Sequence, residues 1–191
     1  MKCGLAWILV GIELGCTQGP SPRFYSARDK LEDQSRRRVA CSETKKAVTL
    51  QARVVSVDAG IDVALTLCNG TLGPIWLNGR FVMNRKDWSP REVWLDIRDE
   101  LGAQYRYDCM DRTMTAEPSD YLVLRPGEGI SGLETSVVGC YQLRKGHTYT
   151  LVARYQDSTV TPPSPPGDAQ YLSNELVAPP VGWGTEVAQA S

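Results

Sequence analysis

Residues 121–156 constrain the fold of this chain more than any other stretch, because apolar residues recur at every second position at both of its ends. Leu122 and Leu124 follow this pattern near the start, and the same period appears near the end at Tyr149, Leu151, Ala153 and Tyr155. A period of two places alternate side chains on one face of a β-strand. Arg-Pro-Gly-Glu at 125–128 and Lys-Gly at 145–146 indicate turns, because Pro fixes φ and Gly permits positive φ.

The same alternation recurs along most of the chain. Val48, Leu50, Ala52 and Val54 predict a half-buried strand that a turn at 58–60 joins to a second strand over 61–67. Further strands are predicted at 75–83, 93–97, 104–107, 121–124, 136–138 and 148–155, with an edge strand at 172–177. Strands and turns spaced by about ten residues predict an all-β protein, an antiparallel Ig-like β-sandwich of about 7–9 strands.

Composition divides the chain into four parts. We predict a signal peptide at 1–15, a disordered tether at 16–46, the sandwich at 47–178 and a loose tail at 179–191. The tether is polar and charged with few apolar residues, which disfavours a packed core there. Residues 161–167, Thr-Pro-Pro-Ser-Pro-Pro-Gly, predict a surface loop, because prolines lack the N–H that a central sheet requires.

The N-terminus has the features of an export signal. Lys2 provides a positive charge, and the apolar run at 5–12 is too short to span a bilayer. Leu14-Gly15-Cys16 resembles the end of a bacterial lipobox, in which the Cys receives a diacylglyceryl group and becomes the mature N-terminus. We therefore expect lipidation at Cys16 and an anchored position at the cell envelope. Glu13 departs from the lipobox pattern, so an ordinary secretory signal and a misplaced start codon are the alternatives.

Export places the remaining cysteines in an oxidising compartment. Four of them lie outside the signal and the lipidation site, and these four allow three disulfide connectivities. We favour Cys109–Cys140 with Cys41–Cys68, because Cys109 ends a predicted strand and Cys140 opens the turn before the last long strand. A metal site is disfavoured, since the sequence has no Cys-x-x-Cys and a single histidine, His147.

The residues that carry catalysis in other proteins are scarce. One histidine limits nucleophile–base arrangements, and paired carboxylates such as Asp96 and Asp99 lie beside predicted turns, where Asp bonds the backbone. Neither a Gly-x-Gly-x-x-Gly motif nor a P-loop occurs. We predict that the chain is not an enzyme and carries no cofactor. Asn69-Gly70-Thr71 matches a glycosylation sequon but is interpreted as a turn.

Tryptophans are the strongest candidates for a binding surface. Trp88 lies in a predicted loop beside Arg85 and Lys86, and an exposed Trp next to two cations favours contact with a partner. Folding of this Trp back over the end of the sandwich is the alternative. Trp76 and Trp94 lie within predicted strands and are expected in the core, although an exposed face for carbohydrate or peptide, with Trp183, is the competing interpretation.

Three segments resemble a known group of Ig-like modules. They are 63–71 (VALTLCNGT), 124–128 (LRPGE) and 146–151 (GHTYTL). These segments are similar to the opening strand, the turn and the closing strand of the proteinase inhibitor BsuPI and of the N-terminal region of deuterolysin-like metallopeptidases. The resemblance covers about residues 47–155 and implies an Ig-like sandwich of the kind found in lipoproteins of Gram-negative bacteria. The zinc motif His-Glu-x-x-His is absent, so peptidase activity is not implied.

Together these features predict a non-catalytic module at the cell envelope that binds an unknown protein partner or has a structural role. The alternative is a secreted or periplasmic proteinase inhibitor of BsuPI-like type, whose loop at 84–90 or 159–167 occupies a protease cleft. A net charge of −1 disfavours nucleic acid as a partner, and membrane contact is expected through the lipid anchor alone.

Overall fold

The computed structural model describes residues 37–41, 46–57, 60–80, 92–108, 116–134, 140–144 and 146–184. These residues form β-strands joined by turns and loops, with one short 3-10 helix, η2 (Pro118–Asp120). The predicted all-β antiparallel sandwich is confirmed. The described part contains twelve strand segments rather than 7–9, because several sheet edges consist of pieces of two to four residues.

One layer of the sandwich is a four-stranded sheet in the order β1-β8-β3-β2. Its strands are β1 (Arg38–Ala40), β8 (Glu128–Glu134), β3 (Gly60–Asn69) and β2 (Val48–Val57). All neighbours are antiparallel, and β2 pairs with β3 along its whole length, from Val48↔Asn69 to Val57↔Gly60. The predicted first hairpin is therefore present.

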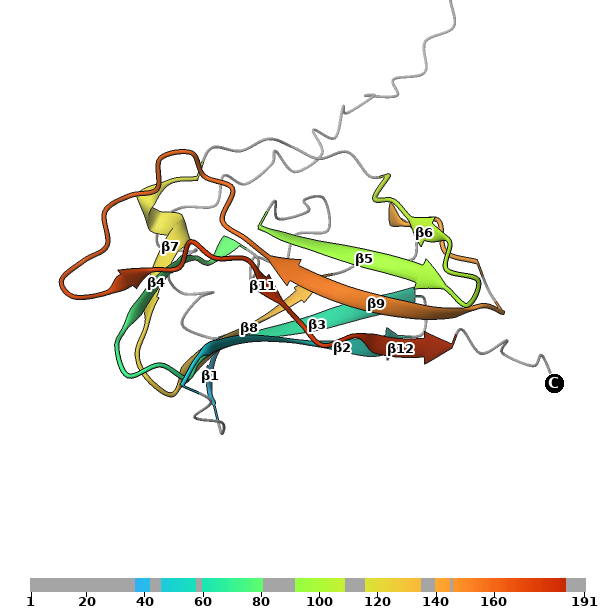
Figure 1. Cartoon of the computed structure of the whole chain (residues 1–191), viewed down its shortest axis with the longest axis horizontal. Coiled ribbons are helices and arrows are strands. Elements are labelled where there is room, and N and C mark those ends of the chain that lie inside the picture. Colours follow the sequence, from blue (N-terminus) through green and yellow to red (C-terminus); the bar gives the residue numbers. More distant parts are fainter. Residues whose placement is uncertain are drawn as a thin grey trace, which may run out of the picture.

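The second layer has five strands, in the order β11-β9-β5-β6 with β12 also on β9. They are β11 (Leu176–Val177), β9 (Thr148–Tyr155), β5 (Val93–Asp99), β6 (Gln104–Tyr105) and β12 (Val181–Gly184). A third, small sheet joins β10 (Gln170–Tyr171), β4 (Ile75–Asn78) and β7 (Tyr121–Leu124) at one end of the molecule. Figure 1 shows the two layers, with β5 and β9 above β2, β3 and β8.

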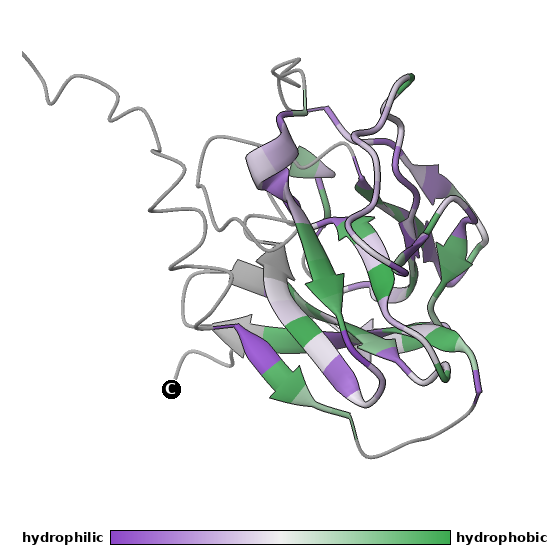
Figure 2. Ribbon diagram, turned by 90° about the vertical axis from the view of Figure 1, so that its left-hand side faces the viewer, coloured by the Kyte–Doolittle hydropathy of each residue, from purple (hydrophilic) through white to green (hydrophobic). Residues whose placement is uncertain are grey.

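The core fills the space between the layers. Its largest contribution from one strand is that of β9, where the alternating residues predicted from the sequence are all buried: Tyr149, Leu151, Ala153 and Tyr155. Facing side chains come from β3, among them Val63, Leu65 and Leu67, while Leu95 and Ile97 of β5 lie next to β9 in the same layer. Figure 2 shows the resulting alternation of hydrophobic and hydrophilic bands along the strands.

The predicted turn at 125–128 connects the small sheet to the first layer. Glu128 N donates to Arg125 O over 3.0 Å, and Gly127 has a φ of +78°, which favours glycine. The Glu128 carboxylate also accepts from Arg125 N (2.9 Å) and pairs with Arg38 of β1 (2.7 Å). This turn therefore helps to position the N-terminal strand.

The predicted disulfide Cys41–Cys68 is present, with the two Cα atoms 5.8 Å apart. It links the residue after β1 to β3, and strand β8 passes between these two strands. Gly129 of β8 permits this crossing, because a Cβ at that position would lie 2.5 Å from Cys41 Sγ and 2.8 Å from Leu67 O. Cys140 is also disulfide-bonded, whereas its predicted partner Cys109 lies outside the described residues.

Sheet pairing extends beyond the predicted domain limits of 47 and 178. Arg38–Ala40, assigned from the sequence to the tether, pairs with β8, and Val181–Gly184, assigned to the tail, pairs with β9. The single edge strand predicted at 172–177 is instead two short strands, β10 and β11, in different sheets. The strand predicted at 136–138 lies outside the described residues.

Two further sequence interpretations have clear outcomes. Asn69 is buried, and its amide donates to Gly73 O and Leu124 O, both over 2.9 Å, while its Oδ1 accepts from Thr71 N. The sequon is therefore a structural turn. The prediction that Trp94 lies in the core is wrong. Its side chain is 36% exposed on the outer face of β5, because Val93 and Leu95 take the inward positions.

Candidate functional site

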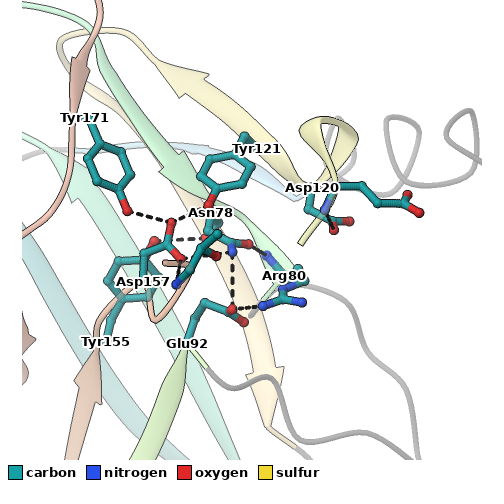
Figure 3. Close-up of polar contacts among 10 residues, drawn as sticks. Asn78, Arg80, Glu92, Asp120, Tyr121, Tyr155, Asp157 and Tyr171 are labelled. Atoms are coloured by element: carbon teal, nitrogen blue, oxygen red, sulfur yellow. Dashed lines mark hydrogen bonds and ion pairs between the residues drawn. The ribbon is translucent and has the colours of Figure 1, made fainter. Parts of the chain in front are cut away.

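A cluster of polar side chains lies where five elements meet at one end of the sandwich (Figure 3). Asn78 ends β4, Tyr121 begins β7, Tyr171 belongs to β10, and Glu92 and Asp157 flank β5 and β9. We call the group formed by Asn78, Arg80, Glu92, Tyr121, Tyr155, Asp157 and Tyr171 the polar node. Its members are up to 93 positions apart in the chain, from 78 to 171.

Asn78 is the centre of the polar node. Its side chain is fully buried, with a relative exposure of 0%. Its Nδ2 donates to Glu92 Oε1 over 3.2 Å and to Asp157 Oδ1 over 3.3 Å, while its Oδ1 accepts from Arg80 N over 3.1 Å. Tyr155 OH donates to the backbone oxygen of Asn78 over 3.0 Å. One amide thus joins the end of β4 to the start of β5 and to the end of β9.

Glu92 is the most deeply buried acid of the polar node, with an exposure of 0%. Burial raises the pKa of its carboxyl group, and the hydrogen bond and the charge of Arg80 offset part of this rise. The ion pair between Arg80 and Glu92 joins the two residues that flank 81–91. That segment contains the predicted partner-binding residues Arg85, Lys86 and Trp88, and it lies outside the described residues.

Asp157 receives donors from three directions. Tyr121 OH and Tyr171 OH donate to Oδ2 over 2.6 Å and 2.9 Å, and Thr159 N donates to Oδ1 over 3.0 Å. Burial alone would raise the pKa of this carboxyl group, but the hydrogen bonds together outweigh it, so the pKa is lowered. Burial and the neighbouring carboxylate raise the pKa of both tyrosines, which therefore remain donors.

The polar node fixes the start of an exposed loop, residues 158–167, which we call the proline-rich loop. The middle of the loop is held by Trp76 of β4, whose Nε1 donates to Pro163 O over 3.3 Å and whose ring stacks on Tyr121 with centroids 5.5 Å apart. Just beyond its end, Gln170 N donates to Pro74 O over 2.9 Å. Figure 1 shows the loop in orange at the left of the molecule, between β9 and β10.

The outer surface of the proline-rich loop is uncharged and partly apolar, with exposed serine and threonine between the apolar residues. Val160 is 98% exposed, and Pro165 and Pro166 are exposed as well. Single exposed apolar side chains are common, but this one lies on a loop that the body of the protein holds at its start, at its middle and just beyond its end. The arrangement can present a fixed apolar surface to another molecule.

The side chains of the polar node bond to one another, and this arrangement is suited to holding the proline-rich loop in place. Asp157 is saturated with donors, and Glu92 pairs with a guanidinium. In the ranges that the structure describes, no three His, Cys, Asp or Glu side chains come together as metal ligands. His147 lies on the surface at the start of β9, 2.9 Å from Glu100 Oε1.

The sequence located the proline-rich loop but not its support. The loop at 159–167 was predicted from its prolines, whereas Asn78, Glu92 and Asp157 resembled ordinary turn residues. Trp76 is half-buried and serves as a platform for the loop rather than as part of the central core. Of the other predicted site residues, Cys16 lies outside the described part of the chain.

Comparison with known proteins identifies no family: no family model matches this chain, and no curated protein matches it. Within the described residues, none of the helical structure is long and apolar enough to cross a membrane.

Proposed function

We propose that this chain is a non-catalytic protein-binding module of the cell envelope that contacts its partner through the proline-rich loop. The observation that carries the proposal is the pairing of a 98% exposed Val160 with a loop base fixed by Asp157 and Trp76. A loop ordered before binding loses little conformational entropy in a complex, which favours its use as a contact surface.

The compartment is part of the proposal and rests on the N-terminal sequence. Export agrees with the presence of the Cys41–Cys68 disulfide, because such bonds persist in oxidising compartments. The lipid on Cys16 would hold the module at a membrane surface. Replacing Cys16→Ser should move the protein from the membrane fraction to the soluble one, and unchanged fractionation would reject the anchor.

Substitution of Val160→Asp tests the contact surface. A charge at this exposed position should weaken capture of the partner by at least roughly tenfold, because a carboxylate that becomes buried without a partner opposes association. Leu101→Asp is the matched control, since Leu101 is 88% exposed on the separate β5–β6 hairpin. Quantitative co-purification from envelope fractions compares the two, and equal capture by both variants would contradict the proposal.

Proteinase inhibition is the second candidate function. It is favoured by the same fixed loop, because a rigid exposed segment can occupy a cleft without adopting the geometry needed for cleavage. The test is to incubate the purified chain with secreted serine proteases and metalloproteases. Inhibition at micromolar excess that Val160→Asp abolishes would support this function, and an unslowed panel would exclude it for these enzymes.

A further inference from the structure

The proline-rich loop contains two Pro-Pro pairs that the fold treats differently. Pro162 and Pro163 are half-buried, whereas Pro165 and Pro166 are exposed, with only Ser164 between the pairs. The two pairs are chemically identical, so the difference in exposure arises from what lies beneath them. The inner pair lies against the body of the protein, and the outer pair faces solvent.

The chain itself shows how such a pair can be bound. Trp76 donates its indole N–H to the carbonyl oxygen of Pro163, and the same indole ring is stacked on Tyr121. An aromatic platform that also offers an N–H donor is the usual means of recognising prolines, because proline has a carbonyl acceptor and an apolar ring but no N–H. Within the molecule, the carbonyl oxygen of Pro163 therefore already accepts from one such aromatic N–H donor.

We propose that the outer pair, Pro165-Pro166, is bound in the same way by a groove on the partner protein that is lined with aromatic rings and N–H donors. This inference rests on the proposed protein-binding function and specifies the class of partner. The contact is between an uncharged, carbonyl-rich loop and an aromatic surface.

The charge distribution favours this partner over an oppositely charged one. Residues 158–167 include no ionisable side chain, although 23% of the chain is charged. The nearest acid on the N-terminal side, Asp157, is turned inward to Tyr121 and Tyr171, and one exposed acid, Asp168, follows the loop on the C-terminal side. Binding should therefore depend little on salt, because screening weakens only contacts between charges.

The prolines also distinguish this partner from a protease cleft. A cleft binds an extended segment partly through its backbone N–H groups, and four of the ten loop residues lack one. A groove that binds carbonyl oxygens and apolar rings needs no backbone N–H from its ligand, so the prolines do not weaken binding to it.

Photo-crosslinking in the full-length chain tests the inference. Benzoylphenylalanine is placed at Val160 or at Ser164, both exposed on the loop, and at Leu101 as the control. We expect adducts to one protein from the two loop positions and none from position 101. The adduct yield should change less than about twofold between 0.05 and 0.5 M salt, roughly the range over which screening of charges strengthens most. Mass spectrometry of the adduct should place the crosslink beside Trp or Tyr residues of the partner.

Paired alanine variants add a second measurement. Pro165→Ala with Pro166→Ala should lower the adduct yield by roughly tenfold or more with little shift of the unfolding midpoint, since both side chains are exposed and the bond from Ala169 N to Pro166 O uses only the backbone. Adducts that fall steeply with salt, or that map to a charged surface, would overturn the inference while leaving protein binding intact. Adducts from position 101 but not from the loop would overturn the inference and the proposed contact surface together.

Discussion

At the scale of single residues, the polar node contains two acids whose pKa values are shifted in opposite directions. Glu92 has donors from two residues and a raised pKa, whereas Asp157 has donors from four residues and a lowered pKa. Both acids accept from the same amide, that of Asn78. Burial raises both pKa values, and the donors outweigh this effect only at Asp157, which is the less deeply buried of the two acids.

Replacement of Asp157→Asn should destabilise the fold at neutral pH by roughly 1–3 kcal/mol, the usual contribution of hydrogen bonds to a charged group. Because the folded-state pKa of Asp157 is lowered, its contribution is present above about pH 4 and is lost as the pH falls through the folded-state value. The difference from the unmodified protein should therefore shrink at acid pH. Urea unfolding from pH 3 to 8 measures it, with Asp96→Asn, in a surface ion pair with Arg154, as the control.

Replacement of Glu92→Gln should give the opposite slope. The folded-state pKa of Glu92 is raised, so its ionisation above about pH 4.3 lowers stability as the pH rises toward the folded-state value. The variant lacks this loss, and its stability relative to the unmodified protein should increase from pH 4 to 7. The constant loss from leaving Arg80 without its carboxylate partner shifts the curve but not its slope. A flat or falling difference in the same urea series would contradict the raised pKa.

At the scale of secondary-structure elements, strand β8 was not recognised from the sequence, although it lies inside a sheet. Its sequence, EGISGLE, contains two glycines and two acids, which are poor strand formers. Contacts with β1 and β3 impose the extended form, and Gly129 is required by the disulfide above it. The strands β2, β3, β5 and β9 were predicted, because their alternation reflects burial of one face against the core. The contacts that impose the extended form on β8, in contrast, leave no periodic signal in the sequence.

Gly129→Ala should destabilise the protein by roughly 1–3 kcal/mol, as expected for overpacking. The added Cβ would meet Cys41 Sγ and the backbone oxygen of Leu67, neither of which can move freely. Gly182→Ala in β12 is the control, because a Cβ there has no neighbour within 4 Å. Thermal or urea unfolding distinguishes them, and equal midpoints would show that β8 can shift under the disulfide.

At the scale of the whole molecule, the sandwich and its disulfide Cys41–Cys68 could be predicted, but its limits and its polar node could not. The limits were missed because β1 and β12 are short and carry little apolar pattern, as in the sequences RVA and VGWG. The polar node was missed because Asn78 and Asp157 are 79 positions apart and meet only when the fold brings the ends of β4 and β9 together. The proline-rich loop was predicted because its composition is local.

The limits of the domain predict the behaviour of shortened chains. A chain that begins at residue 37 retains β1 and the Cys41–Cys68 disulfide, and it should unfold at the same urea concentration as the longer protein. A chain that begins at residue 46 loses both and should be less stable by about 3–4 kcal/mol, the value expected for a disulfide closing a loop of this length. Cys68→Ser in the shorter chain is the control, because it shows whether the unpaired thiol itself lowers the stability. Equal unfolding midpoints for the two chains would contradict the assignment of β1 to the domain.

The disulfide after β1 also has a mechanical consequence. Any force on the N-terminal segment first reaches a strand of only three residues, which ladder hydrogen bonds alone would release early. Beyond Cys41 the load passes through a covalent bond into β3, a ten-residue strand paired on both sides. Force applied at the N-terminal segment would therefore release at most β1 before the Cys41–Cys68 bond carries it into β3.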